Sequence, residues 1–116
     1  MSASFRSDYL EKIEKEFTDA QDARSDGLEG RVRVCVRRGA GFAVAWLCKS
    51  RGQQVRDTDS LNLLKMIQTD ESLPAEVREA SRRLTARINT DFTYAFPTDP
   101  VNDAQIIADY VKRALG

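Results

Sequence analysis

The sequence has 116 residues, of which 41% are hydrophobic and 31% are charged, and its 18 basic and 18 acidic side chains cancel. This length matches one domain with one hydrophobic core, and the apolar fraction is too high for a disordered chain. The longest apolar run, residues 39–48, is about half as long as a membrane-spanning helix, and no signal-peptide pattern opens the sequence. We therefore expect a single domain over residues 1–116, in the cytoplasm and without a membrane anchor.

Histidine is absent from the sequence, which excludes several kinds of catalytic site. Serine–histidine and cysteine–histidine nucleophile systems need an imidazole, and so does most transition-metal binding. The two cysteines, Cys35 and Cys48, fall in one predicted helix, about 20 Å apart along its axis, which is too far for a disulfide. We predict that both are small buried side chains and that the chain has no metal site and no cofactor. The sequence does not exclude catalysis by carboxylates.

Helical periodicity describes the first half of the chain. Acidic and apolar residues predict a first helix over residues 8–24, with Ser7 as its N-cap. After a turn at Gly27, a second helix is predicted over residues 28–51, and Gly52 ends it.

The second half predicts three more helices. Residues 59–69 carry leucine and isoleucine at helical spacing, and a fourth helix is predicted over residues 74–88. Asn102 is the predicted N-cap of the last helix, with Gln105 as its partner in a capping box. No segment alternates like a strand, so we predict an all-α, up-and-down bundle of about five helices. The predicted core consists of Phe17, Leu28, Val32, Phe42, Trp46, Leu64, Leu84, Ile106 and Tyr110.

The charges of this neutral chain are unevenly distributed. Residues 24–56 carry a net charge of +6, whereas residues 1–23 and residues 57–116 each carry −3. One interpretation is that the acidic first helix lies against the basic second helix and that their charges pair at the rim. The other is a basic face for phosphates or RNA, although a pI near 6.3 argues against non-specific nucleic-acid binding. The candidates for ligand or RNA contact are Arg31, Arg37, Arg38 and Arg87.

The second predicted helix has a second apolar face, made mainly of small residues. That face consists of Val34, Gly41, Ala45 and Cys48. A helix that is apolar over most of its circumference must be covered on more than one side. Either the other helices of the chain or a second copy can cover this face. We name these four residues as dimer-interface candidates and expect a homodimer.

The order of these segments resembles the HEPN superfamily of small helical bundles. In that family an arginine-flanked, alanine-rich second helix ends at a glycine, which is Gly52 here. A short leucine-rich helix follows, and the next helix opens with Leu-Pro-x-Glu, here residues 73–76. An aromatic–proline loop then precedes a final amphipathic helix. The resemblance covers roughly residues 28–115 and implies a HEPN-like bundle.

Active HEPN proteins are metal-independent endoribonucleases with a characteristic motif. An arginine is followed after four to six residues by a histidine and often, two positions later, by a tyrosine, and dimerisation usually builds the site from two motifs. The matching residues here are Arg87, Phe92 and Tyr94. Phenylalanine cannot move a proton, so the resemblance implies a degenerate motif without RNA cleavage and gives no catalytic residue. The alternative is a helix-end arginine followed by aromatic residues that seal the loop onto the core.

We therefore expect a non-catalytic HEPN-like domain that binds a protein partner or a nucleotide. Some family members pair with minimal nucleotidyltransferases in toxin–antitoxin or defence-type systems, and Tyr94 would correspond to the tyrosine that is modified in certain pairs. One alternative is an RNA-binding protein, or one with residual ribonuclease activity, that uses the second-helix arginines and Arg87. Another is a purely structural oligomerisation module.

Overall fold

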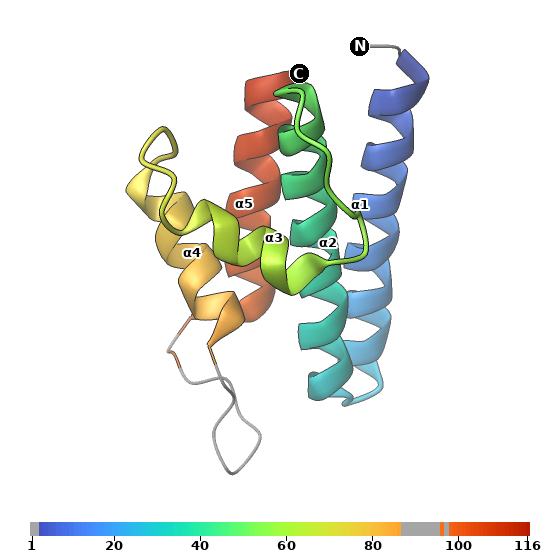
Figure 1. Cartoon of the computed structure of the whole chain (residues 1–116). Helices are drawn as coiled ribbons and strands as arrows, with labels where there is room; N and C mark the ends of the chain where they lie inside the picture. Colours follow the sequence, from blue (N-terminus) through green and yellow to red (C-terminus); the bar gives the residue numbers. More distant parts are fainter. Residues whose placement is uncertain (1–2, 87–95, 97) are drawn as a thin grey trace.

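The described part of the chain consists of helices and their connections. The computed structural model describes residues 3–86, 96 and 98–116, and no strand occurs in these ranges. The predicted all-α helical bundle is therefore confirmed. In Figure 1 the longer helices run along the bundle, the shorter helices lie on one side of it, and the first helix begins at the same end as the C-terminus. In chain order the helices are α1 (Ala3–Ser25), α2 (Glu29–Ser50), α3 (Ser60–Ile67), α4 (Ala75–Thr85) and α5 (Pro100–Leu115).

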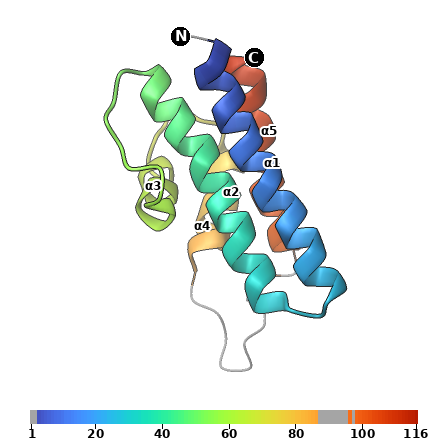
Figure 2. The ribbon, with the colours of Figure 1, turned by 90° about the vertical axis from the view of Figure 1, so that its right-hand side faces the viewer.

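Helix α2 is the central element of the bundle. It packs against α1, α5 and α3, and α3 lies across α2 from α1 (Figure 2). Three neighbours explain why α2 is apolar around most of its circumference. Burial is nearly continuous from Gly39 to Cys48 in its C-terminal half. The predicted second apolar face of this helix is thus covered largely within the chain.

The core is centred on Trp46, which is fully buried. Its ring stacks on that of Tyr9 from α1, with a centroid distance of 6.3 Å and an interplanar angle of 7°. The prediction of Leu28 as a core residue is wrong: it is 51% exposed, because it lies in the connection before α2 rather than on the helix. Of the other predicted core residues, Val32, Trp46, Leu64 and Leu84 are buried, and Phe17, Phe42, Ile106 and Tyr110 are partly buried.

Helices α1 and α2 end in the same glycine motif. Gly27 and Gly52 have φ angles of 75° and 79°, a left-handed conformation that glycine adopts without strain. In each case the glycine N–H and the next N–H donate to carbonyls of the last helical turn, as in a Schellman motif. The predicted turn at Gly27 and the predicted end of the second helix at Gly52 are confirmed. The N-cap prediction of Ser7 is wrong, because α1 already begins at Ala3.

The start of α5 differs from its prediction. Asp99, and not Asn102, is the N-cap: its carboxylate accepts from the Val101 N–H at 2.9 Å, and Pro100 occupies the first turn. Proline at this position has the backbone angle that a helix needs, so an Asp-Pro start extends the helix beyond the predicted capping box. Gln105 donates instead to Asp109 at 2.7 Å.

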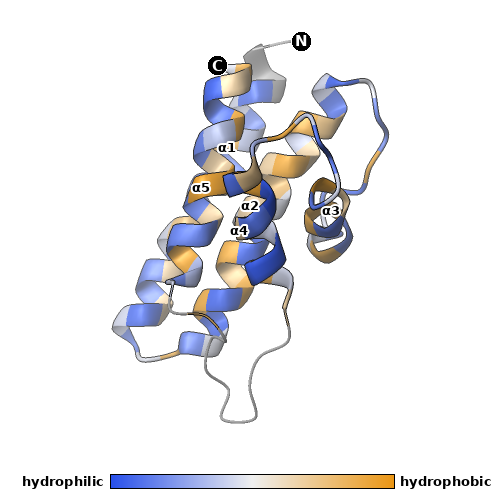
Figure 3. Cartoon of the chain, turned by 90° about the vertical axis from the view of Figure 1, so that its left-hand side faces the viewer, coloured by the Kyte–Doolittle hydropathy of each residue, from blue (hydrophilic) through white to orange (hydrophobic). Residues whose placement is uncertain are grey.

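Hydrophilic residues form much of the outer surface of the bundle. Figure 3 shows broad hydrophilic bands on α4, on the side turned toward the viewer. Helix α4 ends at Thr85, three residues before the predicted end, and Ala86 is extended. None of the described helices combines the length and the apolar character that crossing a bilayer requires.

Candidate functional site

The motif residues of the HEPN resemblance, Arg87, Phe92 and Tyr94, lie outside the described residues. The two helices on either side of that segment are described, and a buried ion pair joins them. Arg83, in the last turn of α4, donates to both carboxylate oxygens of Asp103, with Nη2–Oδ1 and Nε–Oδ2 distances of 2.8 Å and 3.1 Å. Asp103 is fully buried.

The Arg83–Asp103 pair serves to hold the fold together. Thr98 Oγ1 also donates to Asp103 Oδ2 at 2.9 Å, so the carboxylate has several partners. A bidentate arginine–carboxylate pair is strong and fixes geometry as well as charge. It therefore fixes the end of α4 against the start of α5.

Two more arginines strengthen the same end of the bundle. Arg24, from the last turn of α1, donates to both carboxylate oxygens of Asp99 at 2.7 and 3.0 Å and also pairs with Glu29. The hydrogen bond from Arg24 lowers the pKa of the Asp99 carboxyl. The hydrogen bonds to Asp99 and to Glu29 raise the pKa of Arg24. Arg37 donates from Nε to the carbonyl of Leu84 at 2.7 Å.

The predicted ligand-contact arginines of α2 do not share one surface. Arg37 is half-buried and faces α4, where it bonds the Leu84 carbonyl. Arg31 and Arg38 are exposed, and Arg38 approaches Glu16 of α1 only to 4.0 Å. Arg33, another basic residue of α2, is buried, with 8% of its surface exposed. Among the described candidates, the alternative of a basic face is thus reduced to two exposed arginines, Arg31 and Arg38.

The predicted dimer face is mostly covered inside the chain. Gly41, Ala45 and Cys48 are buried, and a Cβ added to Gly41 would lie 2.6 Å from Ser60 Oγ. The first residue of α3 thus occupies the space that a partner helix would need. Val34 alone of the four is exposed, at 44%. The expectation that the whole stripe is open to a second copy is corrected, whereas the oligomeric state itself stays a prediction.

The exposed residues at the start of α2 form one continuous surface. Arg31, Val34 and Arg38 recur at positions i, i+3 and i+7, which places them on one stripe of the helix. Leu28 adjoins them, because Leu28 and Arg31 line the same groove. We call Leu28, Arg31, Val34 and Arg38 the α2 face.

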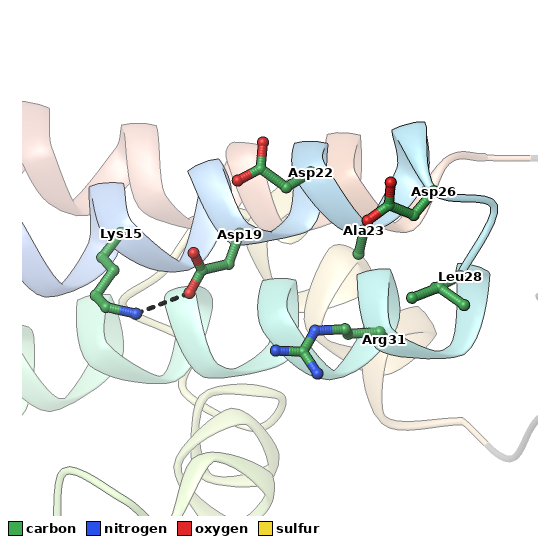
Figure 4. A pocket seen from close by; sticks show the side chains of 7 residues that line it. All are labelled: Lys15, Asp19, Asp22, Ala23, Asp26, Leu28 and Arg31. Carbon is green, nitrogen blue, oxygen red and sulfur yellow. Dashed lines mark hydrogen bonds and ion pairs between the residues drawn. The ribbon is translucent and has the colours of Figure 1, made fainter.

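The groove beside the α2 face lies between the end of α1 and the start of α2 (Figure 4). Lys15 bonds Asp19 at 2.8 Å, and this hydrogen bond lowers the pKa of the Asp19 carboxyl. In Figure 4 the carboxylates of Asp22 and Asp26 point away from Arg31. The groove therefore carries charges of both signs.

A second polar cluster, which the sequence analysis does not predict, lies at the other end of α2. Tyr9 donates its hydroxyl to Asp57 Oδ1 at 2.7 Å, and Lys49 and Lys12 pair with the same carboxylate at 3.0 and 3.4 Å. Burial, followed by the Asp57 hydrogen bond, raises the pKa of Tyr9 to about 12. Burial opposes the charge of Asp57, but the bonds from Tyr9 and Lys49 outweigh it and lower the pKa. The cluster attaches the connection between α2 and α3 to the bundle.

These contacts differ from both interpretations of the charge pattern. Helix α1 does lie against α2, as predicted. The basic residues of the second segment nevertheless pair mainly with the connecting segments and the ends of helices: Arg24 with Asp99, Lys49 with Asp57, and Arg51 with Asp70 at 2.8 Å. Much of the net positive charge of residues 24–56 is thereby neutralised locally.

No family model matches the chain, and neither a curated protein nor a solved structure matches it. Within the described ranges, no group of three or more His, Cys, Asp or Glu side chains is placed to hold a metal ion.

Proposed function

We propose that this chain is a non-catalytic, HEPN-like helical domain that acts by binding a protein partner. The observation that carries the proposal is the α2 face. It exposes two apolar side chains, Leu28 at 51% in the connection before α2 and Val34 at 44% in α2, beside the exposed Arg31 and Arg38. Neighbouring exposed apolar side chains can form the centre of a protein-binding surface, and arginine is enriched at such surfaces.

The state of the carboxylates supports a binding role over an acid–base role. Hydrogen bonds from Ser72 and Arg51 lower the pKa of Asp70, and the bond from Arg24 does so for Asp99. A general acid or base works best with a pKa near the working pH, and these shifts move in the opposite direction. Together with the absence of histidine from the sequence, this favours a domain without its own chemistry.

The HEPN resemblance suggests the class of partner. Some family members pair with minimal nucleotidyltransferases, so such an enzyme is the first partner to examine. The same proposal includes nucleotide binding and a cytoplasmic location. RNA binding is the second candidate, and the net charge of +6 on residues 24–56 favours it. The ion pairs of Arg24, Lys49 and Arg51 weaken that second candidate, because those cations already have carboxylate partners.

The test is purification of the tagged full chain from the cells that make it, with and without nuclease treatment, followed by mass measurement of the intact assembly. We expect a protein partner that survives nuclease treatment, and no RNA cleavage by the purified chain in the absence of metal. Metal-independent cleavage that disappears in Arg87→Ala would contradict the proposal and favour a working ribonuclease. Loss of all bound material after nuclease treatment would favour RNA binding instead.

A further inference from the structure

We infer that the α2 face is a docking surface for an acidic amphipathic helix of a protein partner. The inference rests on the proposed function and specifies the chemistry of the partner that it requires.

The arginines of the α2 face are available to such a partner. Among the described residues Arg31 takes part in no ion pair, and the ion pair of Arg38 is a 4.0 Å approach to Glu16. The side chain of Arg38 is 54% exposed. By contrast, Arg24 and Arg83 have carboxylate partners within 2.8 Å. The two exposed cations therefore differ from the arginines that hold the fold together.

The spacing of the face specifies what can bind it. Seven residues of helix separate Arg31 from Arg38, which corresponds to about 10.5 Å along the axis. Val34 lies between the two arginines, and Leu28 lies beyond Arg31. A partner helix with carboxylates about two turns apart and an apolar side chain between them would pair with both arginines while it covers Val34. This is the helix-on-groove mode of recognition, with anchors at i, i+3 or i+4, and i+7.

The composition of the α2 face disfavours RNA as its occupant. Two of its four side chains, Leu28 and Val34, are apolar and exposed. Leu28 and Val34 form no favourable contact with a phosphate backbone, whereas an apolar side chain of a protein partner that covers them removes apolar surface from water.

A second copy of the chain is also disfavoured. Two α2 helices that pack antiparallel about Val34 place Arg31 of each copy near Arg38 of the other. Two parallel helices place each arginine near its own counterpart. Both arrangements bring like charges together, which costs free energy at an interface. A separate protein with acidic side chains has no such penalty.

The experiment places a photo-crosslinking amino acid, p-benzoyl-phenylalanine, at position 34 of the full chain in the cells that make it. The control carries the same group at position 14, because Glu14 lines a different groove, with Lys112. We expect a crosslink to a protein from position 34 and not from position 14. Sequencing of the crosslinked peptide should find Asp or Glu about two helical turns apart.

Charge reversal makes the test quantitative. Arg31→Glu with Arg38→Glu should reduce the crosslink from position 34 by about tenfold or more, because it places like charges across the contact. Arg6→Glu with Arg113→Glu is the matched control, because both arginines are exposed and the change in net charge is the same. Arg6 is in the first turn of α1 and Arg113 in the last turn of α5, and these helix ends lie at the opposite end of the bundle from the start of α2. That control should leave the crosslink unchanged. Replacing the two partner acids by lysine should restore the crosslink to the reversed variant.

The outcomes separate the inference from the proposed function. A crosslink from position 34 to RNA, to lipid or to a second copy overturns the inference, and so does a protein crosslink that charge reversal leaves unchanged. A protein crosslinked from position 14 but not from position 34 overturns the inference and leaves the proposed function standing. No protein crosslinked from either position, together with no partner in the purified assembly, overturns both.

Discussion

The two halves of α2 have the same backbone conformation but different surroundings. From Gly39 onward α1, α5 and α3 cover the helix, and Val44, Trp46 and Leu47 are buried. Before Gly39 the helix is still buried on one side, at Val32 and Val36, and exposes Arg31, Val34 and Arg38 on the other. The comparison shows that helical periodicity alone does not tell a core face from a binding face. Each of the following variants tests whether the two halves really have separate roles.

The largest effect is expected in the buried half. Trp46→Ala should lower the free energy of unfolding by about 3–5 kcal/mol, because it removes a fully buried ring and leaves a cavity. Val34→Ala, in the exposed half, should change it by less than about 0.5 kcal/mol. Urea denaturation of both variants measures the difference. Similar losses in the two variants would contradict the division of α2 into a core half and an exposed half.

Two ion pairs of α4 can be compared in the same way. Arg83→Ala leaves the buried carboxylate of Asp103 without its main cation and should lower the free energy of unfolding by about 2–4 kcal/mol. This loss is somewhat smaller than the loss expected for a fully buried pair, because Arg83 is partly exposed. Its neighbour Arg82 pairs with Glu79 in the same helix, and both side chains are about half exposed. Arg82→Ala should therefore cost less than about 1 kcal/mol. Equal losses on denaturation would mean that the Arg83–Asp103 pair is not a structural anchor.

Glycine substitutions test where α3 begins to cover α2. Gly41→Ala should lower the free energy of unfolding by about 1–3 kcal/mol, because its Cβ would meet Ser60 Oγ, Cβ and Cα at 2.6–3.0 Å. Gly30→Ala, in the exposed half, has only an ordinary contact at 3.7 Å with Arg33, so it should be neutral or stabilise by up to about 0.5 kcal/mol. Thermal melting of both variants gives the ranking. A stable Gly41→Ala variant would show that α3 leaves this face open.

The Tyr9 cluster predicts a smaller effect that depends on pH. Because the Tyr9 pKa is about 12 in the folded chain against 10.0 ordinarily, the unfolded tyrosine loses its proton first. Its contribution to stability is thus fully present below pH 10 and is lost as the pH rises through about 12. Tyr9→Phe should cost about 1 kcal/mol near neutral pH, through its lost hydrogen bond, and should weaken the alkaline decline.

Denaturation midpoints between about pH 8 and pH 12 measure this decline. Tyr110→Phe is the matched control, because Tyr110 forms no hydrogen bond among the described side chains. Parallel curves for the wild type and Tyr9→Phe would show that the Tyr9–Asp57 bond does not form in solution.

The sequence predicted best what depends on local pattern. Val32, Trp46 and Leu84 were found by helical spacing, and Gly52 by its role at helix ends, because these signals need only neighbouring residues. Leu28 was placed wrongly because the spacing of the second helix was extended into the connection before it. Asn102 is the predicted N-cap because it opens a complete capping box, and the Asp99–Pro100 helix start lies outside that pattern.

Contacts between distant residues could not be predicted in this way. Tyr9 and Asp57 are 48 positions apart, and Arg83 and Asp103 are 20 positions apart. Their pairing depends on how the helices pack, which the charge pattern does not specify. The α2 arginines show the same limit. The sequence analysis groups Arg31, Arg37 and Arg38 as ligand contacts, whereas packing against α4 leaves Arg37 half-buried.

The most direct test of the central claim is the amount of protein partner that the Val34→Asp variant retains on purification, relative to the wild type. The claim is that the exposed stripe in the first half of α2 binds a partner, whereas the second half is buried in the core. We therefore expect Val34→Asp to melt within about 2 °C of the wild type, as an exposed substitution should, and to lose the partner. A variant that is equally stable and retains the full amount of partner would contradict the claim.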